Sequence, residues 1–368
     1  MKQTTNIFIL GFGLLLTACN SGELPDADNT TVAFQPDFQT GETQTRSIVT
    51  GTGTSTEGGA IHQVNVFVTK KDGSAIYPGT TNGVVTFTKS SADAWKGQVN
   101  LHSETARIYA YYPTGITPTL GSNAGGDNID THYIKIEDLA TQTFDGKNDW
   151  DCSAIDYLYG TSTSNPEEAQ SITASNEAGK SQLEPSIYLQ HALAQVAFTM
   201  QTAADRPLTD FDFIKKITIK STSGNLFATA AHMQLKDGTL TATTSVKQLT
   251  FTPTGENDNG GNETASTAIK CGDIRNPVLV GYGLVAPLNS PPADKSITIS
   301  VLLGKKGSEN KENERELSAI LDSPVQWAKG KRYVYPITLT NKAITVGATT
   351  ITPWDQIDGG NDMKPEGI

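Results

Sequence analysis

The sequence has few of the residues that carry catalysis, metal binding or cross-linking. Its 368 residues include three cysteines and five histidines, and aromatic residues make up 7%. No two of the histidines stand at the spacing of metal ligands; they are His62, His102, His132, His191 and His232. Phosphate-binding loops, Gly-x-Ser-x-Gly elbows and His-Glu-x-x-His motifs are absent as well. The sequence therefore favours a protein that is not an enzyme and that holds no metal or cofactor.

Positive charge and long apolar runs are scarce too. Lysine and arginine number 28 against 39 acidic residues, so the net charge is −11. An acidic surface argues against a nucleic-acid partner. A helix needs about 20 consecutive apolar residues to span a membrane, and no stretch after the first residues provides them. We therefore expect most of the chain to lie in water.

Residues 1–18 have the pattern of an export signal. Lys2 precedes the apolar run 7–16, which is too short to span a membrane and ends in small residues. Leu16-Thr17-Ala18-Cys19 resembles a lipobox, where a peptidase cleaves between Ala18 and Cys19 and the cysteine thiol takes up a lipid. Two or more acyl chains hold a protein stably on a membrane. We expect Cys19 to be the lipidated first residue of the mature chain.

The remaining composition is typical of an all-β surface protein. Thr, Ser, Gly and Asn are abundant, and long amphipathic helical patterns are missing. Short alternating segments such as 63–68 and 84–88 are separated by Asp-Gly and Asn-Gly turns, which predict antiparallel pairing. Cys152 and Cys271 are far apart in the sequence, so buried free thiols are favoured and a disulfide is the alternative.

The length of the mature chain predicts more than one domain. Removing the signal leaves 368 − 18 = 350 residues, more than one core usually serves. We predict two antiparallel β-sandwiches, over residues 47–185 and 186–368. The segment 19–46 before them carries a polar tether and a short strand at 31–35, which ends at Pro36. Residues 114–155 are predicted to be rich in loops, with one short strand at Ile134 and Ile136.

Several segments carry motifs that resemble one known family. The closing block contains Trp327 to Leu339, Ile344-Thr345-Val346 and Ile351-Thr352-Pro353-Trp354. Earlier motifs are Thr45-Arg46-Ser47, Tyr109-Ala110-Tyr111-Tyr112-Pro113, Asp156-Tyr157-Leu158-Tyr159-Gly160, and Leu189 to Val196. Together, in this order, they are similar to the fimbrillin-like fimbrial lipoproteins of Bacteroides-type bacteria. The matches cover most of the mature chain.

The resemblance implies a fold, a location and a mechanism of assembly. It implies two transthyretin-like β-sandwich domains in tandem, in a structural or accessory subunit of an adhesive fimbria at the outer membrane. In better-known members an Arg-specific protease cuts after an arginine that follows the first strand. A strand of the next subunit then fills the exposed groove. Here the cut would fall between Arg46 and Ser47 and would remove the strand 31–35. The implied partners are other fimbrial subunits, the membrane through the lipid, and a host protein or glycan.

Several alternatives remain open at this point. The tail 355–368 is polar and Gly-rich, so the segment from Ile344 through Ala348 to Ile351 is the better candidate for a donor strand. That segment also fits the last strand of its own domain. Arg46 is equally well explained as a solvated surface arginine. The alternative function is a monomeric surface lipoprotein that binds a glycan or host ligand through loops at one end of a sandwich.

Overall fold

The computed structural model describes most of the chain after residue 31. The described residues are 32–34, 36–39, 51–52, 60–80, 82–91, 94–101, 105–121, 131–145, 152–168, 170–174, 182–206, 209, 211–254, 269–305 and 311–354. Within them no α-helix occurs, and the helical turns are the 3-10 turns η2 (Pro166–Glu168) and η3 (Lys311–Asn313). The predicted all-β class is confirmed. No helix in these ranges is long and apolar enough to cross a membrane.

The first half of the chain builds an eight-stranded sheet. Its strands run in the order β2 (Asp37–Gln39), β15 (Ser186–His191), β12 (Leu158–Thr161), β9 (Ala106–Tyr112), β5 (Gln63–Lys70), β6 (Val84–Ser91) and β7 (Ala94–Lys96), and β13 (Ile172–Ala174) pairs with β9. A three-stranded sheet has the order β14 (Gln182–Leu183), β1 (Val32–Phe34) and β8 (Val99–Leu101). β3 (Gly51–Thr52) and β4 (Ala60–Ile61) form a short pair.

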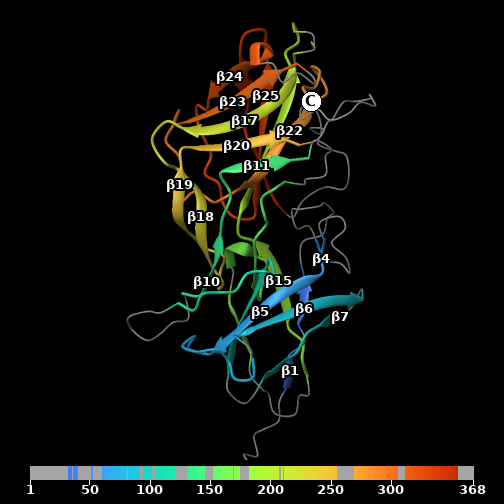
Figure 1. Ribbon diagram of the computed structural model, residues 1–368, viewed down its shortest axis with the longest axis vertical. Coiled ribbons are helices and arrows are strands. Elements are labelled where there is room, and N and C mark those ends of the chain that lie inside the picture. The colour runs from blue at the N-terminus through green and yellow to red at the C-terminus, as the bar shows by residue number, and fades with distance from the viewer. Residues whose placement is uncertain are drawn as a thin grey trace, which may run out of the picture.

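The second half builds two larger sheets and a projecting one. A six-stranded sheet has the order β11 (Thr141–Phe144), β20 (Gln248–Pro253), β17 (Phe213–Ser221), β23 (Ile297–Gly304) and β24 (Arg315–Ile320), with β21 (Ile269–Lys270) beside β17. A five-stranded sheet has the order β22 (Val278–Val285), β16 (Ala194–Thr202), β25 (Lys331–Leu339) and β26 (Ile344–Val346), with β27 (Thr350–Pro353) also on β25. The three-stranded sheet of β10 (Tyr133–Ile136), β18 (Phe227–Gln234) and β19 (Leu240–Val246) lies between the halves (Figure 1).

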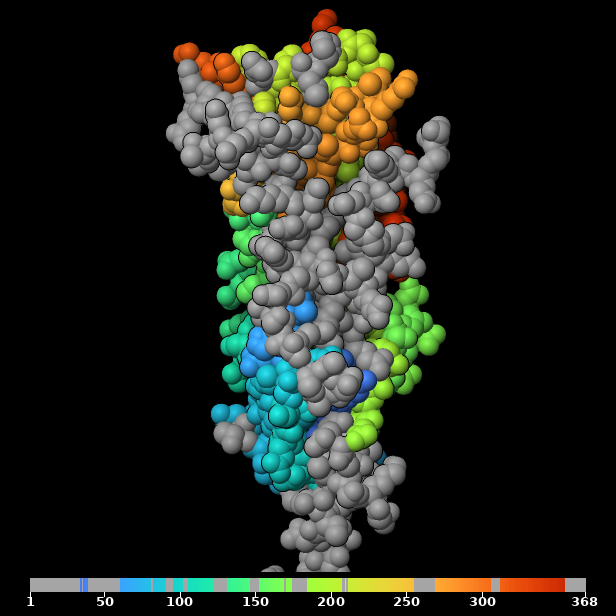
Figure 2. All heavy atoms as spheres, turned by 90° about the vertical axis from the view of Figure 1, so that its right-hand side faces the viewer, coloured from blue at the N-terminus to red at the C-terminus, as the bar shows by residue number. Residues whose placement is uncertain are grey.

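Some strands alternate in burial because one face covers a core, whereas β5, β12, β16 and β22 are buried on both faces. β18 and β25 are clear cases of alternation, with every second side chain buried. One core cluster fills the N-terminal part, around Phe87, Val64 and Ile108. A second, larger cluster fills the C-terminal part and continues onto Tyr109 and Tyr111 of the eight-stranded sheet. The molecule is elongated, with the N-terminal strands at one end and the C-terminal strands at the other (Figures 1 and 2).

The sheets do not divide the chain at a single point. β10 and β11, from the region predicted to be rich in loops, pair with β18 and β20 of the second half. β15, by contrast, pairs with β12 and β2 of the first half, although it begins at residue 186. β15 leads into β16 after two intervening residues, so this stretch passes from one half to the other. The boundary at 185 stays a prediction, because these pairings interleave the two halves.

Candidate functional site

Two short strands at the start of the described chain complete the N-terminal sheets. β1 lies between β8, to which it is antiparallel, and β14, to which it is parallel. β2 runs parallel to the first half of β15, at the edge of the eight-stranded sheet, and the N–H of Asp37 donates to the carbonyl of Pro185 at 3.1 Å. Both strands precede Arg46, so they lie in the segment that a cut there would separate.

Phe34 and Phe38 fix these strands in the core. Phe34 is fully buried and Phe38 is 1% exposed. Both rings meet Phe87 edge-on, with ring centres 6.2 and 5.7 Å apart, and Phe38 also meets Trp95 at 4.8 Å. Lys89 Nζ lies 5.6 Å from the centre of the Trp95 ring, and the buried indole N–H of Trp95 has no hydrogen-bond partner among the described residues. Each phenylalanine contributes about 2 to 3 kcal/mol through burial.

Loss of the two strands would expose a strand edge and an apolar surface beside it. The edge of β15 from Ser186 to Tyr188 would lose its backbone partner. The side of Phe87 and Trp95 that now meets Phe38 would face water. An open strand edge beside an apolar groove is a template for pairing with another extended segment. The geometry thus suits exchange of one strand for another.

Part of this site is predictable from the sequence. The predicted strand 31–35 corresponds to β1, but β2 was missed, because Pro36 reads as a stop and Phe38 is a lone apolar residue among polar ones. One apolar residue between polar neighbours does not form the alternating apolar and polar pattern that predicts a strand. The predicted lipid and processing residues, Ala18, Cys19, Arg46 and Ser47, lie outside the described residues.

The segment considered as a donor strand is paired within its own sheet. β26 lies antiparallel to the second half of β25, and β27 to its first half. Ile344 is buried, whereas Ile351 is 49% exposed. In this structure the segment from Ile344 to Ile351 therefore belongs to the last strands of its own sheet and is not free to act as a donor.

A buried cluster joins the end of this segment to the N-terminal sheet. His191 Nδ1 lies 2.9 Å from Oδ2 of Asp156, whose side chain is fully buried. The His191 ring is stacked on Trp354 with ring centres 4.0 Å apart and an interplanar angle of 6°. The N–H of Trp354 donates to the carbonyl of Gly330. His191 is thus the satisfied core residue that its apolar surroundings predict.

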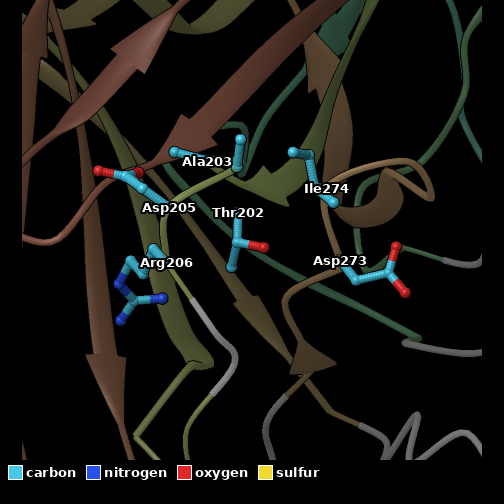
Figure 3. Close-up of a pocket in the computed structure, with 7 residues that line it drawn as sticks. Thr202, Ala203, Asp205, Arg206, Asp273 and Ile274 are labelled. Atoms are coloured by element: carbon cyan, nitrogen blue, oxygen red, sulfur yellow. The ribbon is translucent and has the colours of Figure 1, made fainter.

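A hollow of about 380 Å³ near the end of β16 does not gather reactive groups. It is lined by Thr202, Ala203, Ala204, Asp205, Arg206, Asp273 and Ile274. Asp205 and Asp273 lie on opposite sides of Thr202, and their carboxylates point away from each other (Figure 3). Arg206 is paired with Asp212 through two hydrogen bonds, one of 2.9 Å. Among the described residues no group of three or more His, Cys, Asp or Glu could hold a metal ion.

The remaining residues weighed in the sequence have structural roles. Cys152 and Cys271 are buried and are not joined to each other by a disulfide, as predicted. Trp95, Trp327 and Trp354 are all buried in the core, while Trp150 lies outside the described residues. The described residues therefore build a sandwich protein completed by its own N-terminal strands.

These features define an all-β protein in which two short N-terminal strands complete the N-terminal sheets. The chain belongs to the fimbrillin-like family, whose model matches residues 45–354. This membership supports a fimbrial or adhesion role and implies a place at the cell surface. No curated protein matches the chain.

Several solved structures are similar to this chain at low sequence identity. A cell adhesion protein from Bacteroides ovatus, titled as putative, has 14% identity and a TM-score of 0.50, covering 88% of this chain and 98% of its own. A corresponding protein from Bacteroides uniformis has 13% identity and a TM-score of 0.49 over 89% and 100%. A fimbrial protein from Bacteroides vulgatus has 14% identity and a TM-score of 0.47 over 89% and 100%. At such identity the first of these supports the fold alone.

Proposed function

We propose that this protein is a structural or accessory subunit of an adhesive surface fimbria, assembled by strand exchange after cleavage between Arg46 and Ser47. The observation that carries the proposal is that β1 and β2 both precede Arg46 and insert Phe34 and Phe38 into the N-terminal core. After cleavage these strands are held only by non-covalent contacts, so their effective concentration falls once they leave. A strand from a neighbouring subunit then pairs with β15 and fills the groove.

The proposal includes two tandem transthyretin-like domains and head-to-tail association. Addition of one subunit to the next in this way does not close into a ring and so produces filaments. The protein acts without catalysis. Its place as stalk, tip or anchor depends on which strand serves as donor.

The processing step is tested with purified precursor and an Arg-specific protease. We expect a new N-terminus at Ser47, release of the fragment that ends at Arg46, and a ladder of oligomers on gels with filaments in electron micrographs. Trp95 reports the release, because its ring loses Phe38 and its fluorescence shifts to longer wavelength. The Arg46→Ala variant is the control that stays uncut and monomeric. Cleavage elsewhere, or release without oligomers, would exclude assembly by this route.

We further propose that Cys19 carries the lipid and that the precursor is delivered to the outer membrane by it. Metabolic labelling with palmitate should mark the wild-type chain and not Cys19→Ala. Cys152→Ala is the matched control, since it removes a cysteine that is buried in the fold. Equal labelling of Cys19→Ala and wild type would refute the lipidation. If processing follows, the lipid leaves with the first strands, so the anchor serves delivery only.

The alternative function, a monomeric lipoprotein that binds a ligand through its loops, predicts a different N-terminus for the protein in cells. It retains the fragment that ends at Arg46 and keeps acylated Cys19 as its N-terminus. The N-terminal residue of the protein isolated from cells therefore separates the two functions.

A further inference from the structure

A row of hydroxyl groups crosses the outer face of the six-stranded sheet. The strand registers place five hydroxyl side chains directly opposite one another, in the order Thr141, Thr250, Thr218, Ser300 and Ser318. Directly paired residues project from the same face. The alternate residues of β17, Ile217 and Ile219, are buried in the core, so the row lies on the other face. At about 4.8 Å between strands the row spans roughly 19 Å.

The row follows the long direction of the molecule. β24, β23, β17, β20 and β11 lie one below the other in the upper half of Figure 1 and run across the long axis. Thr141 and Ser318, at the two ends, are exposed, and Ser300 donates or accepts a hydrogen bond with Ser318 at 2.7 Å. Thr218 in the middle is 5% exposed. The row is therefore accessible at its two ends and largely covered at its centre.

Two lysines flank the centre of this row. Lys216 and Lys220 stand on the same face of β17 as Thr218, two residues to either side, and are about 13 Å apart along the strand at 3.3 Å per residue. Lys220 is exposed and Lys216 half-buried. Neither forms an ion pair within the described part of the chain. Among the positions that the registers place on this face, the one acidic residue is Glu316, on the edge strand β24.

We infer that this face binds an acidic polysaccharide, a chain of sugars that carries carboxylate or sulfate groups. In a protein with a net charge of −11, two unpaired lysines at the centre of a sheet form a local positive site that attracts anionic groups. Hydroxyls donate and accept hydrogen bonds, so the row matches the ring hydroxyls of successive sugars. The one aromatic side chain that the registers place on this face, Phe213 opposite Gly304, is 5% exposed and so offers no ring on which bases could stack. A lipid surface would need more apolar contact than Ile320 and the half-buried Leu302 offer.

The test compares defined glycans on the full-length protein. Heparin oligosaccharides serve as a sulfated uronate probe, polygalacturonate as a carboxylate probe, and dextran as a neutral probe, with binding measured by fluorescence anisotropy. We expect both acidic probes to bind and dextran not to bind, with affinity falling as salt rises from 0.1 to 0.5 M because screening weakens charge pairs. The Lys216→Gln/Lys220→Gln double variant should lose at least tenfold in affinity. Ser318→Ala, which removes an exposed hydroxyl of the row, should lose severalfold.

The matched control removes the same charge elsewhere. Lys71→Gln/Lys96→Gln changes two exposed lysines of the N-terminal part, and it should bind like wild type. Circular dichroism and unfolding midpoints verify that every variant is folded. Equal binding by the two double variants would overturn the site, because general charge would then account for the attraction. Failure of both acidic probes to bind, equal binding of dextran, or binding of anionic phospholipid vesicles in place of the glycans would each overturn the ligand class.

Discussion

The buried side-chain amide of Gln142 makes the hydrogen bonds of a neighbouring strand where the two C-terminal sheets meet. Gln142 on β11 is fully buried, and its Nε2 donates to the carbonyl of Leu284 on β22 at 2.6 Å. Its Oε1 accepts the N–H of Leu284 at 2.9 Å, and Nε2 also donates to the carbonyl of Leu139. This pattern satisfies both backbone polar groups of Leu284 on the outer side of the edge strand β22, whose other side pairs with β16. The contact closes one side of the C-terminal sandwich.

Gln142→Ala should therefore destabilise the protein by about 2 to 4 kcal/mol, since it leaves the buried N–H and carbonyl of Leu284 unsatisfied. Urea unfolding followed by circular dichroism measures the change. Gln248→Ala, at an exposed position on β20, is the control and should change stability by less than about 0.5 kcal/mol. Equal effects of the two substitutions would show that the amide does not close the sheet edge.

Cys271 is a second residue whose environment has a measurable consequence. Burial raises the pKa of its thiol to about 12, and the nearby Asp212 carboxylate adds to the rise while Arg206 opposes it. The thiol is 2% exposed and pairs with no other cysteine. It is thus protonated in the folded protein even at mildly alkaline pH.

The stability that this thiol contributes should be lost at high pH. The raised pKa means that the contribution is full below the ordinary value of 9.0 and declines as pH rises toward about 12. The free energy of unfolding of wild type should fall between pH 9 and 11 more steeply than that of Cys271→Ala, by up to about 1.4 kcal/mol per pH unit. Urea titrations at pH 8, 9.5 and 10.5 measure both slopes. Identical slopes would contradict the assignment.

At the scale of elements, local patterns identify strands but not their partners. The segment 63–68 was predicted as a strand and appears as β5 (Gln63–Lys70), because it alternates strongly and ends at a Gly turn. Ile134 and Ile136 likewise mark β10. Nothing local shows that β10 pairs with β18, about a hundred residues later, since long-range pairing depends on how the cores assemble. β2, by contrast, was not predicted because its local pattern is weak: the strand has three residues and one apolar side chain, that of Phe38.

The turn between β18 and β19 docks on the N-terminal sheet, and a glycine makes this contact fit. Gly238 has φ +69°, and a Cβ there would lie 2.2 Å from the ring of Tyr159 on β12. Lys329 covers the same ring, with Nζ 4.7 Å from its centre, and donates to the carbonyl of Asp237 in the turn. Burial lowers the pKa of Lys329, while Asp237 opposes that change.

Gly238→Ala should lower the free energy of unfolding by more than backbone strain alone would. Gly330→Ala is the matched control, because Gly330 has φ +64° but the nearest atom to its Cβ would be 3.9 Å away. We expect Gly330→Ala to lose about 1 to 2 kcal/mol from the left-handed backbone, and Gly238→Ala to lose about 1 to 3 kcal/mol more because the Tyr159 ring must move. Thermal and urea unfolding measure the difference. Equal losses would mean that the hairpin does not press on Tyr159.

At the scale of the whole molecule, the two ends are coupled through a small joint. His191 ends β15 of the N-terminal sheet, Asp156 lies two residues before β12, and Trp354 follows the last strand of the C-terminal part. The N–H of Ala192 donates to the carbonyl of Tyr157, and the N–H of Gly330 donates to the carbonyl of Leu193. The stretch that leads from β15 into β16 is therefore held on both sides.

His191→Ala should weaken this coupling and reduce cooperativity. The substitution removes the ring that stacks on Trp354 and a hydrogen-bonded partner of the buried Asp156 carboxylate, with an expected loss of about 3 to 5 kcal/mol. If the joint couples the halves, wild type unfolds in one calorimetric transition, and the variant unfolds in two separate or broadened ones. His232→Ala is the control, because its ring stacks on Tyr133, within the projecting sheet, and it should leave the single transition intact. Two transitions already in wild type would mean that the halves are independent, whereas one sharp transition in His191→Ala would place the coupling elsewhere, in the docking of the β18–β19 turn on Tyr159.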